Sequence, residues 1–295
     1  MRKAAPVVFV LLWSTGFVGA KYGLPYADPF VFLTLRMLAA TVLLMVLIVV
    51  LKSERILSKK QIGQSALAGL LLHGGYLGGV FYGIAHGLPA GVSAVIVSMQ
   101  PVLVSVLAVP LLKERLRTLQ VVGLIAGTFG VLLVLLPGLQ SAFGSDSISS
   151  LGLAAGVVAL AAGTSGTLLQ KSNGAGIPML AGTSVQYMVS GAVFAFIAVT
   201  TDSLSVQWSV QFIFALAWLT IALSIGAILL LFFLLRNGSA AGVSSLYYLV
   251  PAATSLEAFL LFGERLSTAS IVGVVITALG VSLVLRPTPS AKIGV

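Results

Sequence analysis

The sequence has very little charge and no cysteine. Only 23 of its 295 residues are charged, 16 of them Lys or Arg and 7 Asp or Glu. A soluble domain of this length carries roughly 74 charged residues. Hydrophobic residues make up 59% of the chain, so the composition excludes both a water-soluble surface and a disordered chain. The lack of cysteine excludes a disulfide scaffold, and a helical membrane protein with several spans remains.

Long hydrophobic runs are what the sequence has instead. A transmembrane helix needs about 20 apolar residues, and ten such runs are bounded by charge, Gly or Pro. The runs are continuous rather than alternating, which favours helices over the strands of a barrel. Short connections leave no room for a soluble domain, so we expect an all-α, polytopic membrane protein with ten transmembrane helices. The expected spans are residues 4–21, 30–51, 62–84, 91–111, 118–136, 151–170, 178–200, 211–235, 240–262 and 268–286.

The net charge of +9 follows the loops between these spans. With the N-terminus inside, 13 of the 16 Lys and Arg residues fall on the inner side, as the positive-inside rule requires. Lys21 and Arg265 fall in outer loops, and Arg36 lies within the second span. We therefore expect both termini in the cytoplasm and no nucleic-acid partner, because no soluble domain presents a basic face. The inner residues are Arg2, Lys3, Lys52, Arg55, Lys59, Lys60, Lys113, Arg115, Arg117, Lys171, Arg236, Arg286 and Lys292.

The chain also matches itself at an offset of 150 residues. The clearest matches are Lys113-Glu114-Arg115-Leu116 with Gly263-Glu264-Arg265-Leu266, Pro101 with Pro251, Gly123 with Gly273 and Gly130 with Gly280. Residues 1–140 and 141–295 then hold five spans each. Because five is odd, the second half must enter the membrane from the opposite side. We expect two inverted five-helix repeats in one membrane domain, an architecture of many secondary transporters. A monomer suffices, since the fused halves already supply the pseudo-twofold relation.

These features resemble a known superfamily. Each half has a Pro-containing fourth span, a following Glu-Arg-Leu segment and a Gly-rich fifth span, as in the drug/metabolite transporter superfamily. More narrowly, the chain resembles EamA-type exporters and bacterial exporters of amino acids, aromatic ones included. The resemblance covers nearly the whole chain and implies export of small metabolites, amino acids first, across the inner membrane. It also implies alternating access through a central cavity between the repeats.

Two alternatives in substrate remain open. The first is proton-coupled antiport of other small organic solutes or drugs. The second is exchange of phosphorylated sugars, which would need Lys or Arg in the cavity to meet phosphate. The fourth, sixth and ninth spans carry no cation in mid-span, so sugar phosphates rank below the other substrates.

Polar and aromatic side chains in mid-span are the candidate substrate-binding residues. His73 is central in the third span, Tyr76 follows on the same helical face, and Tyr82 lies further along. An ionisable group at this depth is costly unless it faces a wet cavity or a partner. His73 is therefore either a substrate ligand or a structural histidine bonded to a neighbouring helix. The other candidates, each of which could instead serve helix packing, are Trp13, Ser14, Gln100, Ser244, Tyr247 and Tyr248.

Two prolines and two charges are candidates for gating. Pro101 and Pro251 occupy matching positions near the middle of their spans, where a proline frees a backbone carbonyl. Each either borders the cavity as a hinge or only kinks its helix. Arg36 and Glu257 lie at similar depths from the outer end of their spans. They could form a salt bridge or outer gate, or each could pair elsewhere; Glu257 could also carry a proton.

The expected partners are a small-molecule substrate and the lipid bilayer. We find no nucleotide-binding sequence, and no spacing of His and carboxylate residues that suits a metal ion. We therefore expect neither a cofactor nor a metal. His73 and Glu257 lie at different depths, with no nucleophile at a defined spacing, so an enzyme is not expected.

Overall fold

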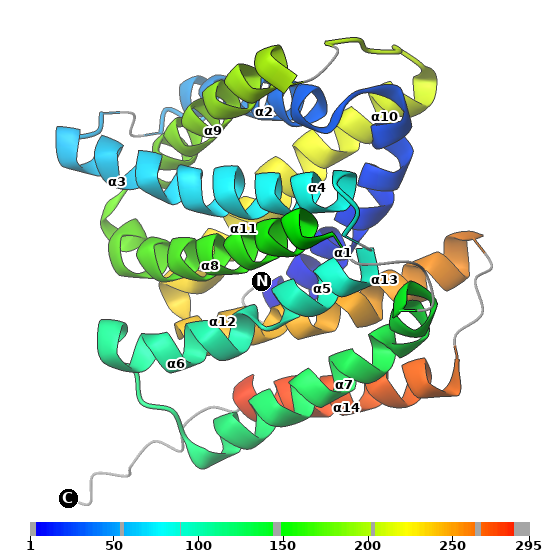
Figure 1. Cartoon of the computed structure of the whole chain (residues 1–295). Coiled ribbons are helices and arrows are strands. Elements are labelled where there is room, and N and C mark those ends of the chain that lie inside the picture. The colour runs from blue at the N-terminus through cyan, green and yellow to red at the C-terminus, as the bar shows by residue number, and fades with distance from the viewer. Residues whose placement is uncertain are drawn as a thin grey trace, which may run out of the picture.

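The computed structural model describes residues 4–53, 56–88, 90–143, 149–201, 204–262 and 267–285. Strand pairing in these ranges is limited to an isolated bridge between Ala27 and Val206. The rest of the regular structure is helical (Figure 1). The second Glu-Arg-Leu segment, residues 264–266, lies outside the described residues, as do Arg2, Lys3, Arg55, Arg286 and Lys292.

The two halves have the same order of elements apart from the short turn η5 in the second half. The first half contains α1 (Ala5–Gly23), the 3-10 turn η1 (Leu24–Tyr26), α2 (Pro29–Val50), α3 (Lys59–Gly69), the π-helix η2 (Leu70–Gly75), α4 (Tyr76–Ala85), α5 (Ala90–Ser98), α6 (Gln100–Leu112) and α7 (Thr118–Phe143). The second half contains α8 (Ser150–Asn173), the 3-10 turn η3 (Gly174–Gly176), α9 (Met179–Thr201), α10 (Val210–Trp218), the π-helix η4 (Leu219–Ala227), α11 (Ile228–Asn237), α12 (Ala240–Ser245), the 3-10 turn η5 (Leu246–Tyr248), α13 (Leu249–Phe262) and α14 (Thr268–Leu285). The internal repeat in the sequence is therefore also a repeat in the structure.

Eight helical stretches are long and apolar enough to cross a membrane, among the described residues. The two other predicted spans are helical as well. One falls on α1, whose apolar stretch is Ala5–Gly16, and the other on α12, η5 and α13, which are short pieces in succession. The protein is thus a multi-pass helical membrane protein, as the small number of charged residues predicts.

The third span of each half contains a π-helix, which the sequence did not predict. In both halves a wide turn, η2 or η4, joins two α-helices, so α3–η2–α4 corresponds to α10–η4–α11. π-helices are rare and occur frequently at functional sites. Their presence at equivalent places in both halves indicates a shared role.

The fourth and ninth spans are irregular in the middle. Met99 is a turn residue between α5 and α6, although its backbone stays in the right-handed helical region, and the 3-10 turn η5 lies between α12 and α13. Pro101 and Pro251 lie near the middle of their spans, in the first turns of α6 and α13 and just after these irregular turns. A proline is tolerated there because the first backbone N–H groups of a helix have no partner within it.

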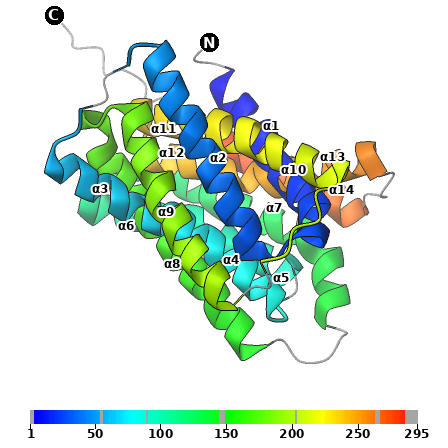
Figure 2. The ribbon, with the colours of Figure 1, turned by 90° about the horizontal axis from the view of Figure 1, so that it is seen from above.

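Helices α7 and α14 show how the halves are related. A Cβ atom built on Gly123 would lie 2.5 Å from the carbonyl oxygen of Gly280. One built on Gly273 would lie 2.6 Å from that of Gly130. Gly123 of α7 therefore meets Gly280 of α14, and Gly130 meets Gly273. Gly273 is the repeat equivalent of Gly123, and Gly280 is that of Gly130, so each contact is the repeat equivalent of the other. The two helices thus run antiparallel about a local pseudo-twofold axis; α2 and α9 likewise pack together (Figure 2).

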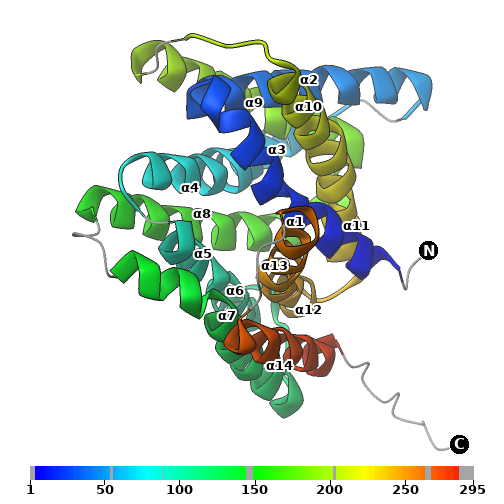
Figure 3. The same cartoon turned by 90° about the vertical axis from the view of Figure 1, so that its right-hand side faces the viewer.

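The first helix of each half packs on the π-helix of the other. Gly16 of α1 faces Leu223 of η4, and a Cβ atom at Gly16 would lie 2.6 Å from Leu223 Cδ2. Gly166 of α8 faces Leu72 of η2 in the same way, at 2.7 Å from Leu72 Cγ. In Figure 3, α1 crosses between α10–α11 and α13. These crossed contacts bring both π-helices to the centre of the molecule.

Candidate functional site

A cavity of about 420 Å³ lies between the two halves. Its walls come from α1, η1 and α2, from η2 and α4, and from α9, η4 and α11. The volume lies in the range of small-molecule sites, roughly 300–1,000 Å³. Four residues singled out from the sequence line it, namely Trp13, Arg36, His73 and Tyr76.

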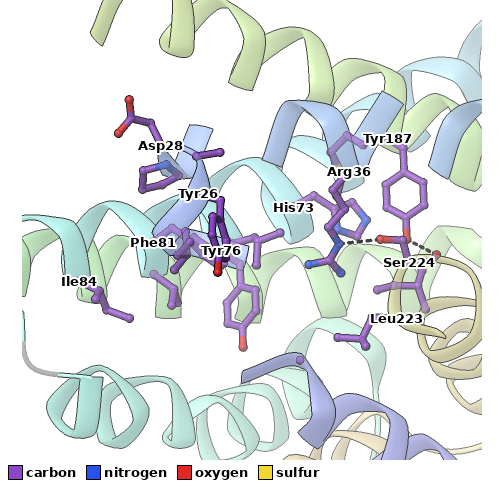
Figure 4. A pocket seen from close by; sticks show the side chains of 18 of the residues that line it. Tyr26, Asp28, Arg36, His73, Tyr76, Phe81, Ile84, Tyr187, Leu223 and Ser224 are labelled. Carbon is purple, nitrogen blue, oxygen red and sulfur yellow. Dashed lines mark hydrogen bonds between the residues drawn. The ribbon is translucent and has the colours of Figure 1, made fainter. Parts of the chain in front are cut away.

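A polar cluster occupies one end of the cavity (Figure 4). Arg36 Nε donates a hydrogen bond to Ser224 Oγ at 2.9 Å, and the Tyr187 hydroxyl donates to the Ser224 carbonyl. The His73 ring packs on the Tyr187 ring with centroids 4.8 Å apart. The two π-helices place His73 and Ser224, while α2 and α9 place Arg36 and Tyr187. Both halves of the molecule therefore build this cluster.

The other end of the cavity is its mouth. Asp28, Ser205 and Gln207 line it there, in the connections between helices. Tyr26, Phe81 and Ile84 also lie toward this end (Figure 4). The cavity therefore runs from an entrance that mixes polar, aromatic and apolar side chains to a cluster of polar groups at its other end.

A second, much smaller pocket of about 10 Å³ is the repeat counterpart of the cavity. It is lined by Gly174, Ile177 and Gln186. At an offset of 150 these residues correspond to Leu24, Ala27 and Arg36, which line the cavity. Residues 24–36 thus border a wide cavity, whereas the equivalent residues 174–186 border only a small gap, which we call the collapsed pocket.

Hydrogen bonds close the protein around the collapsed pocket. Lys171 Nζ donates to two carbonyls near the end of α11, at 2.5 and 2.7 Å. Arg236 donates to two carbonyls of segment 174–177. Gln61 Nε2 donates to the Gly176 carbonyl at 2.8 Å. We call Lys171, Arg236 and Gln61 the latch. Their donor groups tie the ends of α3, α8 and α11 together.

Several predicted substrate-binding residues do not line the cavity. Tyr82 stacks on His86 with ring centroids 3.8 Å apart. Gln100 Nε2 donates to Thr167 Oγ1 at 3.1 Å and so joins α6 to α8. Ser244 Oγ donates to a carbonyl of its own helix at 2.7 Å. In this structure these residues contact neighbouring residues and helices rather than the cavity, as the alternative of a role in helix packing predicts.

The two adjacent tyrosines of η5 differ from each other. Tyr247 packs edge-on against Trp13, with centroids 5.4 Å apart, and so supports a cavity-lining side chain from behind. The Tyr248 hydroxyl lies 2.8 Å from Thr128 Oγ1 and joins η5 to α7. Neither tyrosine lines the cavity.

The gating candidates are also separated. Ser14 Oγ donates to Glu257 Oε1 at 2.5 Å, and Glu257 Oε2 has no hydrogen-bond partner within the described part of the chain. Arg36 is bonded to Ser224 instead, so no Arg36–Glu257 salt bridge is formed. The reason is that Glu257 on α13 faces α1, whereas Arg36 faces the cavity. Pro101 and Pro251 do not line the cavity either.

Sequence reasoning missed Tyr187 and Ser224. Tyr187 follows Gln186, the repeat partner of Arg36, and that position in mid-span could have revealed it. Ser224 is one of many serines within spans, and no signal in the sequence separates it from the rest.

The comparisons with known proteins agree with this architecture. The family model described as "EamA-like transporter family" matches residues 5–136 and 150–286, one match for each half. No curated protein matches the sequence. A solved structure titled "Crystal structure of protein" has the same fold, with a TM-score of 0.80, 15% sequence identity and 95% of each chain covered. Because the family model covers both halves and so nearly the whole sequence, the chain belongs to the EamA-like transporter family.

Proposed function

We propose that this chain moves small organic solutes, amino acids among them, across the cytoplasmic membrane by alternating access. In this proposal ten spans form two inverted five-helix repeats, both termini are cytoplasmic, and a monomer is the working unit. The exported solute occupies the cavity between the repeats. Membership of a transporter family supports a transport role rather than catalysis.

The proposal rests on the difference in volume between the cavity and the collapsed pocket at the equivalent place in the second half. Two halves of opposite orientation can exchange conformations, which would open the collapsed pocket and close the cavity. The volumes of about 420 and 10 Å³ are what one end state of such an exchange requires. By the distribution of Lys and Arg, the cavity mouth faces away from the cytoplasm and the latch lies on the cytoplasmic side.

The lining of the cavity supports amino acids over the alternatives. Trp13 and Tyr76 offer aromatic surface, and Arg36 and His73 offer polar groups. Sugar phosphates gain some support from Arg36, because the structure brings this cation into the cavity from the second span. Proton-coupled antiport of other solutes stays the alternative, with Glu257 as its candidate proton carrier.

A flux assay in proteoliposomes tests the proposal. We expect saturable counterflow of amino acids, and none of polyamines, nucleosides or sugar phosphates. Comparison with and without a pH gradient, in the wild type and in Glu257→Gln, separates proton coupling from facilitated diffusion. Transport of sugar phosphates alone, or of no solute in the panel, would overturn the proposal.

His73→Ala should lower amino-acid counterflow about tenfold while the protein still inserts and folds. His73 is 4% exposed, and its Nε2 atom has no hydrogen-bond partner among the described residues. Because His73 lines the cavity beside Tyr187, its replacement removes a polar group from the proposed substrate site. His86→Ala is the matched control, since His86 is exposed and outside the cavity lining. Unchanged kinetics in His73→Ala would remove His73 from the site.

A further inference from the structure

Within the part of the chain that the structure describes, no acid is paired with the charge of Arg36. Its side chain is only 7% exposed and lines the deep end of the cavity. A guanidinium has five N–H donors, and the bond to Ser224 Oγ is its only hydrogen bond within the described ranges. Taking a charge out of water without a partner is costly, and within a membrane such charges mark functional sites. The cluster therefore carries a positive charge that an anionic ligand would neutralise.

His73 and Tyr187 lie in the same cluster as Arg36, but neither side chain supplies a negative charge to balance the guanidinium. His73 is buried beside Tyr187, with Nε2 unpartnered in the described part of the structure. The Tyr187 hydroxyl is already committed to the Ser224 carbonyl. Ser224 thus fixes both Arg36 and Tyr187, which holds the guanidinium in place before any ligand arrives. A fixed guanidinium binds a carboxylate or phosphate through two parallel hydrogen bonds.

The number of charges decides between these two anions. Among the described residues that line the cavity, Arg36 is the only Lys or Arg, and Asp28 adds a negative group at the mouth. A phosphate ester carries about −1.5 to −2 charges at neutral pH, which a single guanidinium leaves partly uncompensated. A carboxylate carries one charge and is matched by Arg36 alone.

Among the described residues that line the deep end of the cavity there is no acid that could pair with an ammonium group. Asp28, which directly precedes α2, and Arg36 are eight residues apart, so their backbones lie about 12 Å apart along the helix axis, and their side chains lie at opposite ends of the cavity (Figure 4). The amine of an α-amino acid bound at Arg36 through its carboxylate cannot reach Asp28 over this distance. We propose that the Arg36 end of the cavity binds one carboxylate of the transported solute, and that this binding needs no ammonium group. Calling the ligand the transported solute rests on the proposed function, but the binding site does not.

Binding of four small aromatic probes to the full chain in nanodiscs tests this inference by calorimetry. Phenylpropionate, phenylpropionamide, phenethylamine and phenyl phosphate share an aromatic body that suits Trp13 and Tyr76 and differ in charge. We expect phenylpropionate to bind at least tenfold more tightly than the amide or the amine. Arg36→Met should abolish this preference, Arg36→Lys should keep part of it, and Lys60→Met on the exposed start of α3 should keep all of it.

Three outcomes would overturn the inference. Equal binding of the carboxylate and the amide to the wild type is the first. A carboxylate preference that persists in Arg36→Met is the second. Tighter binding of phenyl phosphate than of phenylpropionate, the third, would replace the carboxylate with a phosphate. If Arg36→Met does not fold, Ser224→Ala serves instead, with several-fold weaker binding of phenylpropionate and unchanged binding of the amide expected. Because the calorimetry measures binding and not transport, its results test the carboxylate site even if the proposed transport function is wrong.

Discussion

Lys171→Met combined with Arg236→Met should open the side of the protein that is closed in this structure. The two side chains donate four hydrogen bonds to backbone carbonyls around the collapsed pocket. Hydrogen bonds from charged groups contribute about 1.5–3 kcal/mol each, and about 1.4 kcal/mol is a tenfold change in an equilibrium constant. Since these donors would be hydrated when the latch opens, we expect the opposite state to become at least tenfold more populated.

Single cysteines report this change cleanly, because the chain has none of its own. Ile84 lines the cavity mouth and is 40% exposed. Its repeat counterpart is Leu235, because the nearby match of Ala90-Gly91-Val92-Ser93 with Ala241-Gly242-Val243-Ser244 has an offset of 151, and Leu235 is 1% exposed. In the wild type a thiol reagent should label Ile84→Cys quickly and Leu235→Cys slowly. In the double variant we expect Leu235→Cys to react at least tenfold faster and Ile84→Cys to react more slowly.

The opposite directions of the two changes distinguish a switch from damage. A rise in both labelling rates would indicate local loosening and would contradict alternating access between these states. Lys60→Met is the control, because it removes a charge from the exposed start of α3 without touching the latch. It should leave both rates unchanged.

The positions of the helices could be predicted from the sequence because lipid leaves the backbone few choices. The span expected at 178–200 is α9, Met179–Thr201, and that expected at 118–136 lies within α7. The π-helices could not be predicted, since one extra residue in a turn changes no hydropathy. Nor could the irregular turns at Met99 and η5, because their sequences are as apolar as a regular helix.

The candidate site could be predicted only in part, and for a different reason. Trp13, Arg36, His73 and Tyr76 are unusual enough in mid-span to attract notice, and they line the cavity. Gln100 and Ser244 were also candidates for substrate binding. In the structure Gln100 donates to the Gly163 carbonyl of α8, and Ser244 donates to the Ala240 carbonyl of its own helix. In a membrane protein the lipid-facing and buried sides of a helix are both apolar, so the pattern does not show which way a polar residue points.

Gly130→Ala should separate α7 from α14 and cost about 2 kcal/mol of stability. The new Cβ atom would lie 2.6 Å from the Thr277 nitrogen and 2.8 Å from the Gly273 carbonyl oxygen. Both are backbone atoms, so no rotamer change relieves the overlap and the helices must move apart. Thermal unfolding in detergent measures the loss, and Gly63→Ala is the control, because nothing lies within 4 Å of a Cβ atom there.

The same measurement tests the pseudo-twofold relation between the halves. Gly280 is the repeat counterpart of Gly130, and its Cβ atom would lie 2.6 Å from the Gly127 nitrogen and 2.7 Å from the Gly123 carbonyl oxygen. If equivalent residues make equivalent contacts, Gly280→Ala should destabilise the protein by about the same amount as Gly130→Ala. Because helices in lipid gain little from hydrophobic burial, this close approach of two backbones is itself the source of their association. An unfolding temperature of Gly130→Ala as high as that of Gly63→Ala would mean that α7 and α14 do not meet along these glycines.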